Sequence, residues 1–118
     1  MVKDFRELGS WRRAHQLALD VYRDTDALPQ SEVFGLKVQL RRAAVAVPTR
    51  IAEGCGREVD LEFAASLHRA RATASELEYL LLLCRDLAYV PEEVYSRLLD
   101  EVVEVRKMIS GLLRRMQV

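Results

Sequence analysis

Two stretches of the sequence repeat apolar residues in alternating steps of four and three, and this spacing restricts the fold more than any other feature. Such a repeat places its apolar residues on one side of an α-helix and is typical of helices that pack along their length. The first stretch, residues 61–88, makes a helix of roughly 42 Å at about 1.5 Å per residue. The two repeats are Phe63, Leu67, Ala70, Ala74, Leu77, Leu81, Cys84 and Ala88, followed by Val94, Leu98, Val102, Val105, Ile109, Leu112 and Met116.

Two more helices are predicted before them, one over about residues 11–27 and one that follows a cap at Ser31 and includes the basic stretch 36–57. Pro48 lies inside the second, where it cannot donate a backbone hydrogen bond and crowds the carbonyl of Ala44, so we expect a kink there. Four long helices joined by connections of about 3 to 6 residues predict an all-α fold, an antiparallel up-down-up-down four-helix bundle. The chain of 118 residues is long enough for one such domain, spanning 1–118. The stripes facing the core are Trp11, Ala14, Leu17, Ala18, Val21, Tyr22 and Leu28, and Leu36, Leu40, Ala43, Val47 and Ile51.

The ends of these helices carry recognisable signals. Ser10, Ser31 and Asp60 are predicted N-caps, because their side-chain oxygens can accept from free backbone N–H groups. Pro91 suits the first position of the last helix. Gly54 and Gly56 are expected to supply the left-handed conformation that ends the kinked helix.

Positive charge is clustered on the kinked helix. The whole chain has 18 basic and 18 acidic residues, so any affinity for nucleic acid has to come from local clustering. Residues 36–57 have a net charge of +4, with Glu53 their single acid, whereas residues 92–104 have a net charge of −4. The candidate phosphate-binding residues are Lys37, Arg41, Arg42, Arg50 and Arg57, and Arg69 and Arg71 could extend their surface.

The same arginines have a structural interpretation, as a solvated helix face with salt bridges within or between subunits. For the acids we expect Glu53 to pair with Arg42 or Arg57, or Glu78 to reach across to the kinked helix. The aromatic residues stand mostly at core spacing, so no stacking surface for single-stranded nucleic acid is expected.

No arrangement of residues points to catalysis or to a metal. A di-iron bundle needs Glu three residues before an inward-facing His, but Arg12 precedes His15 and Ala65 precedes His68. Cys55 and Cys84 lack the paired spacing of zinc sites, and both are expected to be structural thiols. We therefore expect no enzyme activity, no metal and no cofactor.

No targeting or membrane segment is evident either. No apolar run approaches the roughly 18 residues that span a membrane, and residues 1–7 lack a signal-peptide core. The prediction is a cytoplasmic protein without a membrane partner.

Several motifs resemble those of a known family. They are Trp11 to Ala18 followed by Tyr22, Phe34-Gly35-Leu36, Gln39 to Ala44, Val47-Pro48, Ile51 to Gly54, Gly56-Arg57, Phe63 and Ala72 to Glu78. From about residue 3 to residue 115, the chain resembles the four-helix bundle proteins encoded in intervening sequences of bacterial 23S ribosomal RNA genes.

This resemblance implies a non-enzymatic homopentamer arranged as a ring or barrel. The chain is also similar to the accessory variability protein of diversity-generating retroelements, which implies binding to nucleic acid and to a reverse transcriptase. A second apolar edge at Leu80, Leu82, Leu83 and Leu87 agrees with a contact between subunits.

Two hypotheses about function follow. In the first, an oligomeric bundle binds RNA, other nucleic acid or a nucleoprotein partner through the arginines of the kinked helix. In the second, the bundle is a scaffold or adaptor for a protein, for example a reverse transcriptase, and makes no direct contact with nucleic acid.

Overall fold

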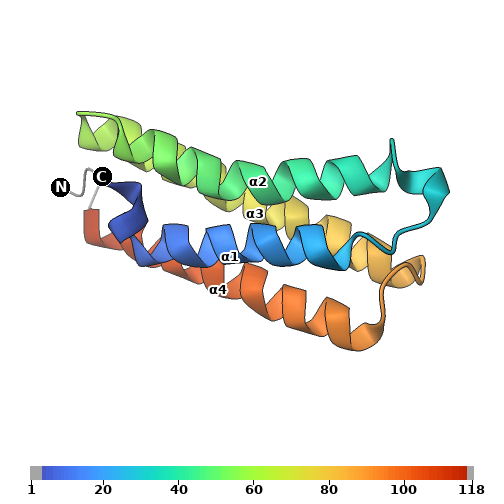
Figure 1. Cartoon of the computed structure of the whole chain (residues 1–118). Helices are drawn as coiled ribbons and strands as arrows, with labels where there is room; N and C mark the ends of the chain where they lie inside the picture. Colours follow the sequence, from blue (N-terminus) through green and yellow to red (C-terminus); the bar gives the residue numbers. More distant parts are fainter. Residues whose placement is uncertain (1–3, 117–118) are drawn as a thin grey trace.

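The computed structural model describes residues 4–116, so the first three and last two residues of the domain predicted over 1–118 lie outside the described part. The described residues form helices and no strand, which confirms the all-α class (Figure 1). The long helices are α1 (Gly9–Asp24), α2 (Leu36–Cys55), α3 (Asp60–Asp86) and α4 (Glu92–Met116), and two short 3-10 helices are η1 (Phe5–Glu7) and η2 (Gln30–Glu32).

The four helices form an antiparallel bundle (Figure 1). Each packs against its neighbours in the chain, and α4 packs back on α1, whereas the diagonal pairs α1–α3 and α2–α4 make no close backbone contact within residues 4–116. The bundle measures 44 × 23 × 20 Å, close to the roughly 40 Å that the 27 residues of α3 span. The predicted up-down-up-down four-helix bundle is confirmed. No helix among the described residues has the length and apolarity needed to cross a membrane.

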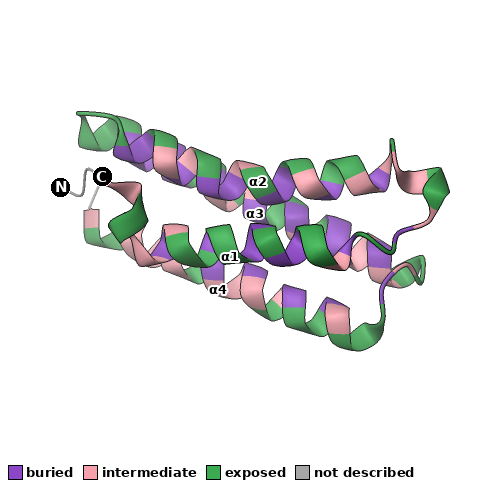
Figure 2. Ribbon diagram, in the orientation of Figure 1, coloured by how far each residue is buried: buried purple, intermediate pink, exposed green. Residues whose placement is uncertain are grey.

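The predicted seams form the core, with changes at their ends (Figure 2). On α3, every seam residue from Phe63 to Cys84 is buried, but Ala88 lies beyond the helix and is exposed. On α4, Tyr95 and Leu113 are buried while the predicted Val94 and Leu112 are only half-buried. The four-three repeat thus identifies the buried residues in the middle of each helix but fails in the terminal turns, where fewer neighbouring residues surround the helix.

All three predicted N-caps are wrong. Asp60 is the first residue of α3, whose N-cap is Val59, and the other two fail because the chain reaches their helices by another path. The N-cap of α1 is Leu8, and Ser10 lies in the first turn, where its hydroxyl is buried and has no partner among the described residues. Ser31 lies in η2, so α2 begins only at Leu36. Its first turn is capped instead by Glu32, whose Oε1 accepts from the Leu36 N–H at 3.0 Å.

Gly35 makes that cap possible. It has the unusual backbone angles φ −115° and ψ −110°, and a Cβ on it would lie 2.7 Å from Oε1 of Glu32. The other carboxylate oxygen of Glu32 accepts from the Tyr89 hydroxyl at 3.0 Å, which ties this turn to the α3–α4 connection. The α1–α2 connection spans residues 25–35, so it is longer than the predicted connection of about 3 to 6 residues. Leu28, in this connection, is buried in the core.

The glycines at the end of α2 serve packing and not a left-handed turn. Gly56 has φ −77°, so the predicted left-handed geometry is wrong. Gly54 is buried inside the helix, and a Cβ on it would lie 2.7 Å from Cδ1 of Phe63 and 2.8 Å from Cβ of Ser66. The missing side chain thus lets α2 and α3 approach closely near their shared connection.

Pro48 is buried in the middle of α2, and the helix continues through it from Leu36 to Cys55. The next residue, Thr49, donates its hydroxyl to the carbonyl of Val45 at 2.7 Å. Pro48 has no N–H to donate to the carbonyl of Ala44, and the Thr49 hydroxyl adds a donor at the neighbouring carbonyl, that of Val45.

Candidate functional site

The five predicted basic residues of α2 divide into two groups, and the first is held within the chain. Arg41 donates from Nη2 to Oδ1 of Asp26 at 2.8 Å and to the carbonyl of Tyr22 at 2.9 Å, and from Nε to the Thr25 hydroxyl at 3.0 Å. Lys37 Nζ lies 4.0 Å from the same Asp26 oxygen. These two side chains fasten α2 to the end of α1, and they share one carboxylate, which offsets one of their two charges.

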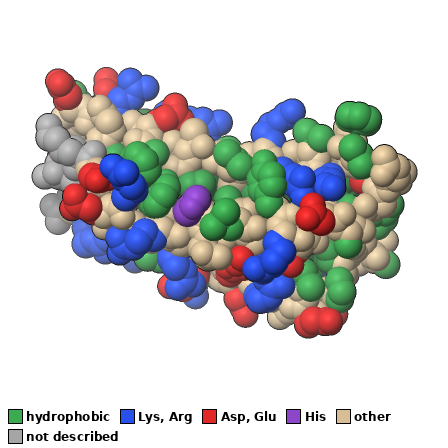
Figure 3. Space-filling view, viewed as in Figure 1, with side chains coloured by type: hydrophobic (Ala, Val, Ile, Leu, Met, Phe, Trp, Pro, Cys, Tyr) green, Lys and Arg blue, Asp and Glu red, His purple; other side chains and the backbone are tan. Residues whose placement is uncertain are grey.

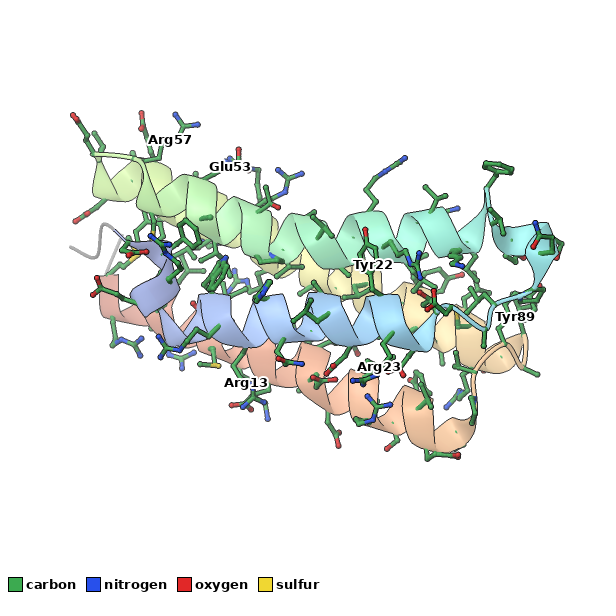
Figure 4. The ribbon with its side chains drawn as sticks, in the orientation of Figure 1. Arg13, Tyr22, Arg23, Glu53, Arg57 and Tyr89 are labelled. Atoms are coloured by element: carbon green, nitrogen blue, oxygen red, sulfur yellow. The ribbon has the colours of Figure 1, made fainter. Side chains whose placement is uncertain are left out.

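In the second group, Arg42 and Arg50 lie on the outer side of α2, and Arg57 follows two residues after the helix ends at Cys55. Arg42 and Arg57 are exposed and Arg50 is half-buried, and none of them makes an ion pair within residues 4–116. Glu53 stands among them, and Figure 4 shows Glu53 and Arg57 pointing away from the bundle. The predicted pairing of Glu53 with Arg42 or Arg57 does not form among the described residues.

The other predicted charges lie elsewhere. Glu78 pairs with Arg106 of α4 and not with α2, because α3 turns this side toward α4. Arg71 donates to the Ser110 hydroxyl of α4 at 3.2 Å, and Arg69 donates to Ser66 within α3 at 3.0 Å. Arg71 therefore extends the α3–α4 side of the bundle and not the arginine face of α2.

Two adjoining hollows run along the seam between α1 and α2. One of about 560 Å³ is lined by Tyr22, Val38, Val45 and the side of α2 that carries Arg42 and Arg50. The other, of about 470 Å³, continues along α1 past Leu19 and His15 to Trp11. Figure 3 shows this face, where hydrophobic side chains and a histidine gather over α1 and α2 with basic side chains nearby.

Aromatic side chains on the outer side of α1 line these hollows. Trp11 and His15 stack with ring centres 4.9 Å apart and planes 7° apart, and Phe5 meets Trp11 at 4.8 Å. Tyr22 is 44% exposed, and the Arg41 guanidinium lies over its ring at 4.5 Å from the centre. The expectation that Tyr22 belongs to the core is therefore wrong.

A signal for this surface was present in the sequence. Trp11, His15, Leu19 and Tyr22 follow one another at steps of four, four and three, which makes a second stripe beside the core stripe of the same helix. Two of its members, Leu19 and Tyr22, are exposed although they are large and apolar.

An acidic pair joins α1 to α4 on the other side of α1. Glu101 lies close enough to Asp20 for each carboxyl to shift the pKa of the other, its Oε2 is buried without a hydrogen-bond partner among the described residues, and Gln16 donates to Asp20 at 3.0 Å. Burial, with the contact to Asp20, raises the pKa of Glu101 to about 7. Burial opposes the charge of Asp20, but the interaction with Glu101, the hydrogen bond from Gln16 and the nearby Arg23 and Arg97 outweigh it and lower the pKa of Asp20.

The two thiols are buried and unpaired. Cys84 is fully enclosed, and burial raises its pKa to about 11. Burial also raises the pKa of Cys55 at the end of α2. Both predicted structural thiols are confirmed as buried. Within residues 4–116, no three His, Cys, Asp or Glu side chains come together as metal ligands.

The fold and this face define the class of protein: an antiparallel four-helix bundle with exposed arginines and an apolar, aromatic hollow along α1 and α2. Within that class, the chain belongs to the 23S rRNA-intervening sequence protein family, whose family model matches residues 6–111. The resemblance noted in the sequence is confirmed.

A solved structure shares the fold. It is the crystal structure of a protein of unknown function from the S23 ribosomal protein family of Bacteroides thetaiotaomicron VPI-5482, with a TM-score of 0.82. The two are 20% identical, and the match covers 88% of this chain and 97% of that one. At this identity the likeness supports the fold alone. No curated protein matches the chain.

Proposed function

We propose that this protein is a non-enzymatic, oligomeric bundle of the cytoplasm that binds RNA, or a nucleoprotein containing RNA, through the arginines of α2. The observation that carries the proposal is the division of the basic residues. Lys37 and Arg41 both pair with Asp26, whereas Arg42, Arg50 and Arg57 remain without an ion pair in the described part of the chain. Guanidinium groups left unmatched on one face are suited to phosphate oxygens.

The spacing of the three arginines suits an extended partner. Arg42 and Arg50 are about 12 Å apart along the axis of α2, at roughly 1.5 Å per residue, and Arg57 follows beyond the end of the helix. Basic groups spaced in this way favour a polymer with repeated charges over a single small anion.

Fluorescence anisotropy of a labelled, structured RNA tests this proposal. The variant with Arg42→Glu and Arg50→Glu should lose at least tenfold in affinity, because two phosphate contacts become repulsive. The matched control, Arg114→Glu with Arg115→Glu, makes the same charge change at the exposed end of α4 and should change affinity much less. Equal losses in both variants would mean that α2 carries no site.

The proposed oligomer uses another side of the bundle. Tyr79 and Leu87 of the α3 region are 59% and 46% exposed, and Leu82 and Leu83 between them are half-buried. This apolar edge, left open by the single chain, is a surface for a second copy. Light scattering should give about five times the 13.5 kDa chain mass, as a homopentamer requires, and Leu87→Glu should lower it.

A protein-binding scaffold is the second candidate, and a specific arrangement favours it. The basic face of α2 and the acidic stretch 92–104 of α4 lie on diagonal helices, so they can meet only between copies, in a head-to-tail contact. In that case the Arg42→Glu and Arg50→Glu variant would dissociate the oligomer, and the wild type would not bind RNA. The ring would then present its remaining surface to a protein partner.

A further inference from the structure

We propose that the hollows between α1 and α2 bind single-stranded RNA, with unpaired bases stacked on Tyr22 and His15 and phosphates held by Arg42 and Arg50. This inference rests on the proposed function and narrows it, since it names both the form of RNA and the place where its bases lie.

Tyr22 is a prepared stacking surface. Arg41 lies over one face of its ring and is itself fixed by Asp26, Thr25 and the Tyr22 carbonyl. The ring is therefore held in place before any ligand arrives, yet 44% of the residue remains exposed and lines both hollows. A ring that is already ordered loses little entropy when a base stacks on it.

His15 ends a second aromatic group. Phe5 and His15 both contact Trp11, with ring centres 4.8 and 4.9 Å from that of the indole, and His15 is exposed. His15 and Tyr22 stand seven residues apart on α1, roughly 10 Å along the helix, with Leu19 between them. The two rings are thus placed to stack separate bases of one strand.

Charge and hydrogen-bonding groups stand where a nucleotide would need them. Arg42 and Arg50 line the first hollow together with Tyr22, so a base on this ring can have its phosphate reached by a guanidinium group. Glu53 lines the second hollow, as His15 does, and its carboxylate can accept from the exocyclic amino group of cytosine or adenine. Uracil has no such group, so the site should favour strands that contain cytosine or adenine.

The combination selects unpaired RNA. In a duplex the faces of the bases are covered by their neighbours, and the stacking surfaces of the hollow would stay unused. A row of arginines alone would bind duplex and single strand alike, so the aromatic groups are what separates the two.

Trp11 offers a direct readout, because it is the single tryptophan of the chain and lines the second hollow. Titration with ten-nucleotide oligo(A), oligo(C) and oligo(U) should quench its fluorescence, and a ten-base-pair RNA duplex should do so weakly. We expect at least tenfold tighter binding of oligo(A) or oligo(C) than of the duplex. The substitution Glu53→Gln should reduce the difference in affinity between oligo(C) and oligo(U).

Substitutions of Tyr22 test the stacking itself. Tyr22→Ala should weaken oligo(A) binding about tenfold, within the usual range for loss of one stacked base, and Tyr22→Phe should restore it. The control is Phe34→Ala, which removes an aromatic ring that is 95% exposed but lies outside the hollows. Circular dichroism confirms that each variant keeps its helices.

Two results would overturn the inference in distinguishable ways. If duplex and single strand bind equally, Tyr22→Ala has no effect and the Arg42 and Arg50 variant still loses affinity, the hollow is not a base site but the proposed function stands. If no RNA binds and Tyr22→Ala lowers the mass of the assembly, a second copy of the chain covers the hollow and both proposals fail.

Discussion

Ala88 is the non-glycine residue with a positive φ, 61°, among the described residues, and it ends α3. The Tyr89 N–H reaches the carbonyl of Cys84 and the Ala88 N–H reaches that of Arg85, both at 2.9 Å, so the turn is a Schellman motif. The left-handed conformation costs an alanine about 1 kcal/mol. Ala88→Gly should therefore raise the free energy of unfolding by about 0.5 to 1 kcal/mol in urea denaturation. A loss of stability would contradict this account of the turn.

Gly54 presents the opposite case. A methyl group there would push Phe63 and Ser66 of α3 away from α2, because atoms of both side chains lie within 2.8 Å of the new Cβ. Gly54→Ala should destabilise the bundle by about 1 to 3 kcal/mol, the usual cost of overpacking. Gly111→Ala on α4 is the matched control, since its Cβ would meet only arginine side-chain atoms at 3.6 Å or more. That variant should gain up to about 1 kcal/mol from helix propensity. Urea denaturation measures both.

At the scale of elements, the contact between α1 and α4 should depend on pH. The folded pKa of Glu101, about 7, lies above its ordinary value of 4.5, so its stabilising contribution is complete below pH 4.5 and is lost as the pH rises to about 7. Asp20 has a lowered pKa, so its contribution is present above pH 3.8 and is lost in stronger acid. The contact between α1 and α4 should therefore be most stable in mild acid.

Glu101→Gln tests this dependence, because glutamine keeps the hydrogen-bonding shape but never ionises. The wild type should lose of order 1 kcal/mol relative to the variant between pH 5 and pH 8, after screening by solvent is allowed for. Glu93→Gln, an exposed position on the same helix, serves as the control. If the free energy of unfolding changed equally in the wild type and in Glu101→Gln between the two pH values, the raised pKa of Glu101 would be contradicted.

The helices and their core seam were predictable because burial repeats with the period of the helix, as from Phe63 to Cys84. The caps were not, because a cap depends on the path of the preceding chain: Ser31 has the right chemistry, but Glu32 reaches the helix start. The site was predictable only in part, because the partners of its residues also depend on the path of the chain. The arginines stand out in the sequence, but the partner of Arg41 is Asp26, in a connection that has no periodicity.

For the whole molecule, the arrangement of the helices separates three surfaces. The arginine face and the aromatic hollows lie along α1 and α2, the acidic stretch lies on the diagonal helix α4, and the open apolar edge lies on α3. One rigid bundle can therefore hold RNA on one side while a second copy occupies another. This separation is what allows the proposed assembly and the proposed binding to coexist.

The most direct test of the central claim is the salt dependence of RNA binding, measured by anisotropy from about 50 to 200 mM salt for the wild type and for Arg42→Gln with Arg50→Gln. Each phosphate contact to a single strand contributes about 0.7 to the slope of log affinity against log salt. The account predicts that the double variant has a slope shallower by about 1.4, while Arg114→Gln with Arg115→Gln leaves the slope unchanged. Equal slopes for the wild type and the α2 variant would show that these arginines do not contact phosphate.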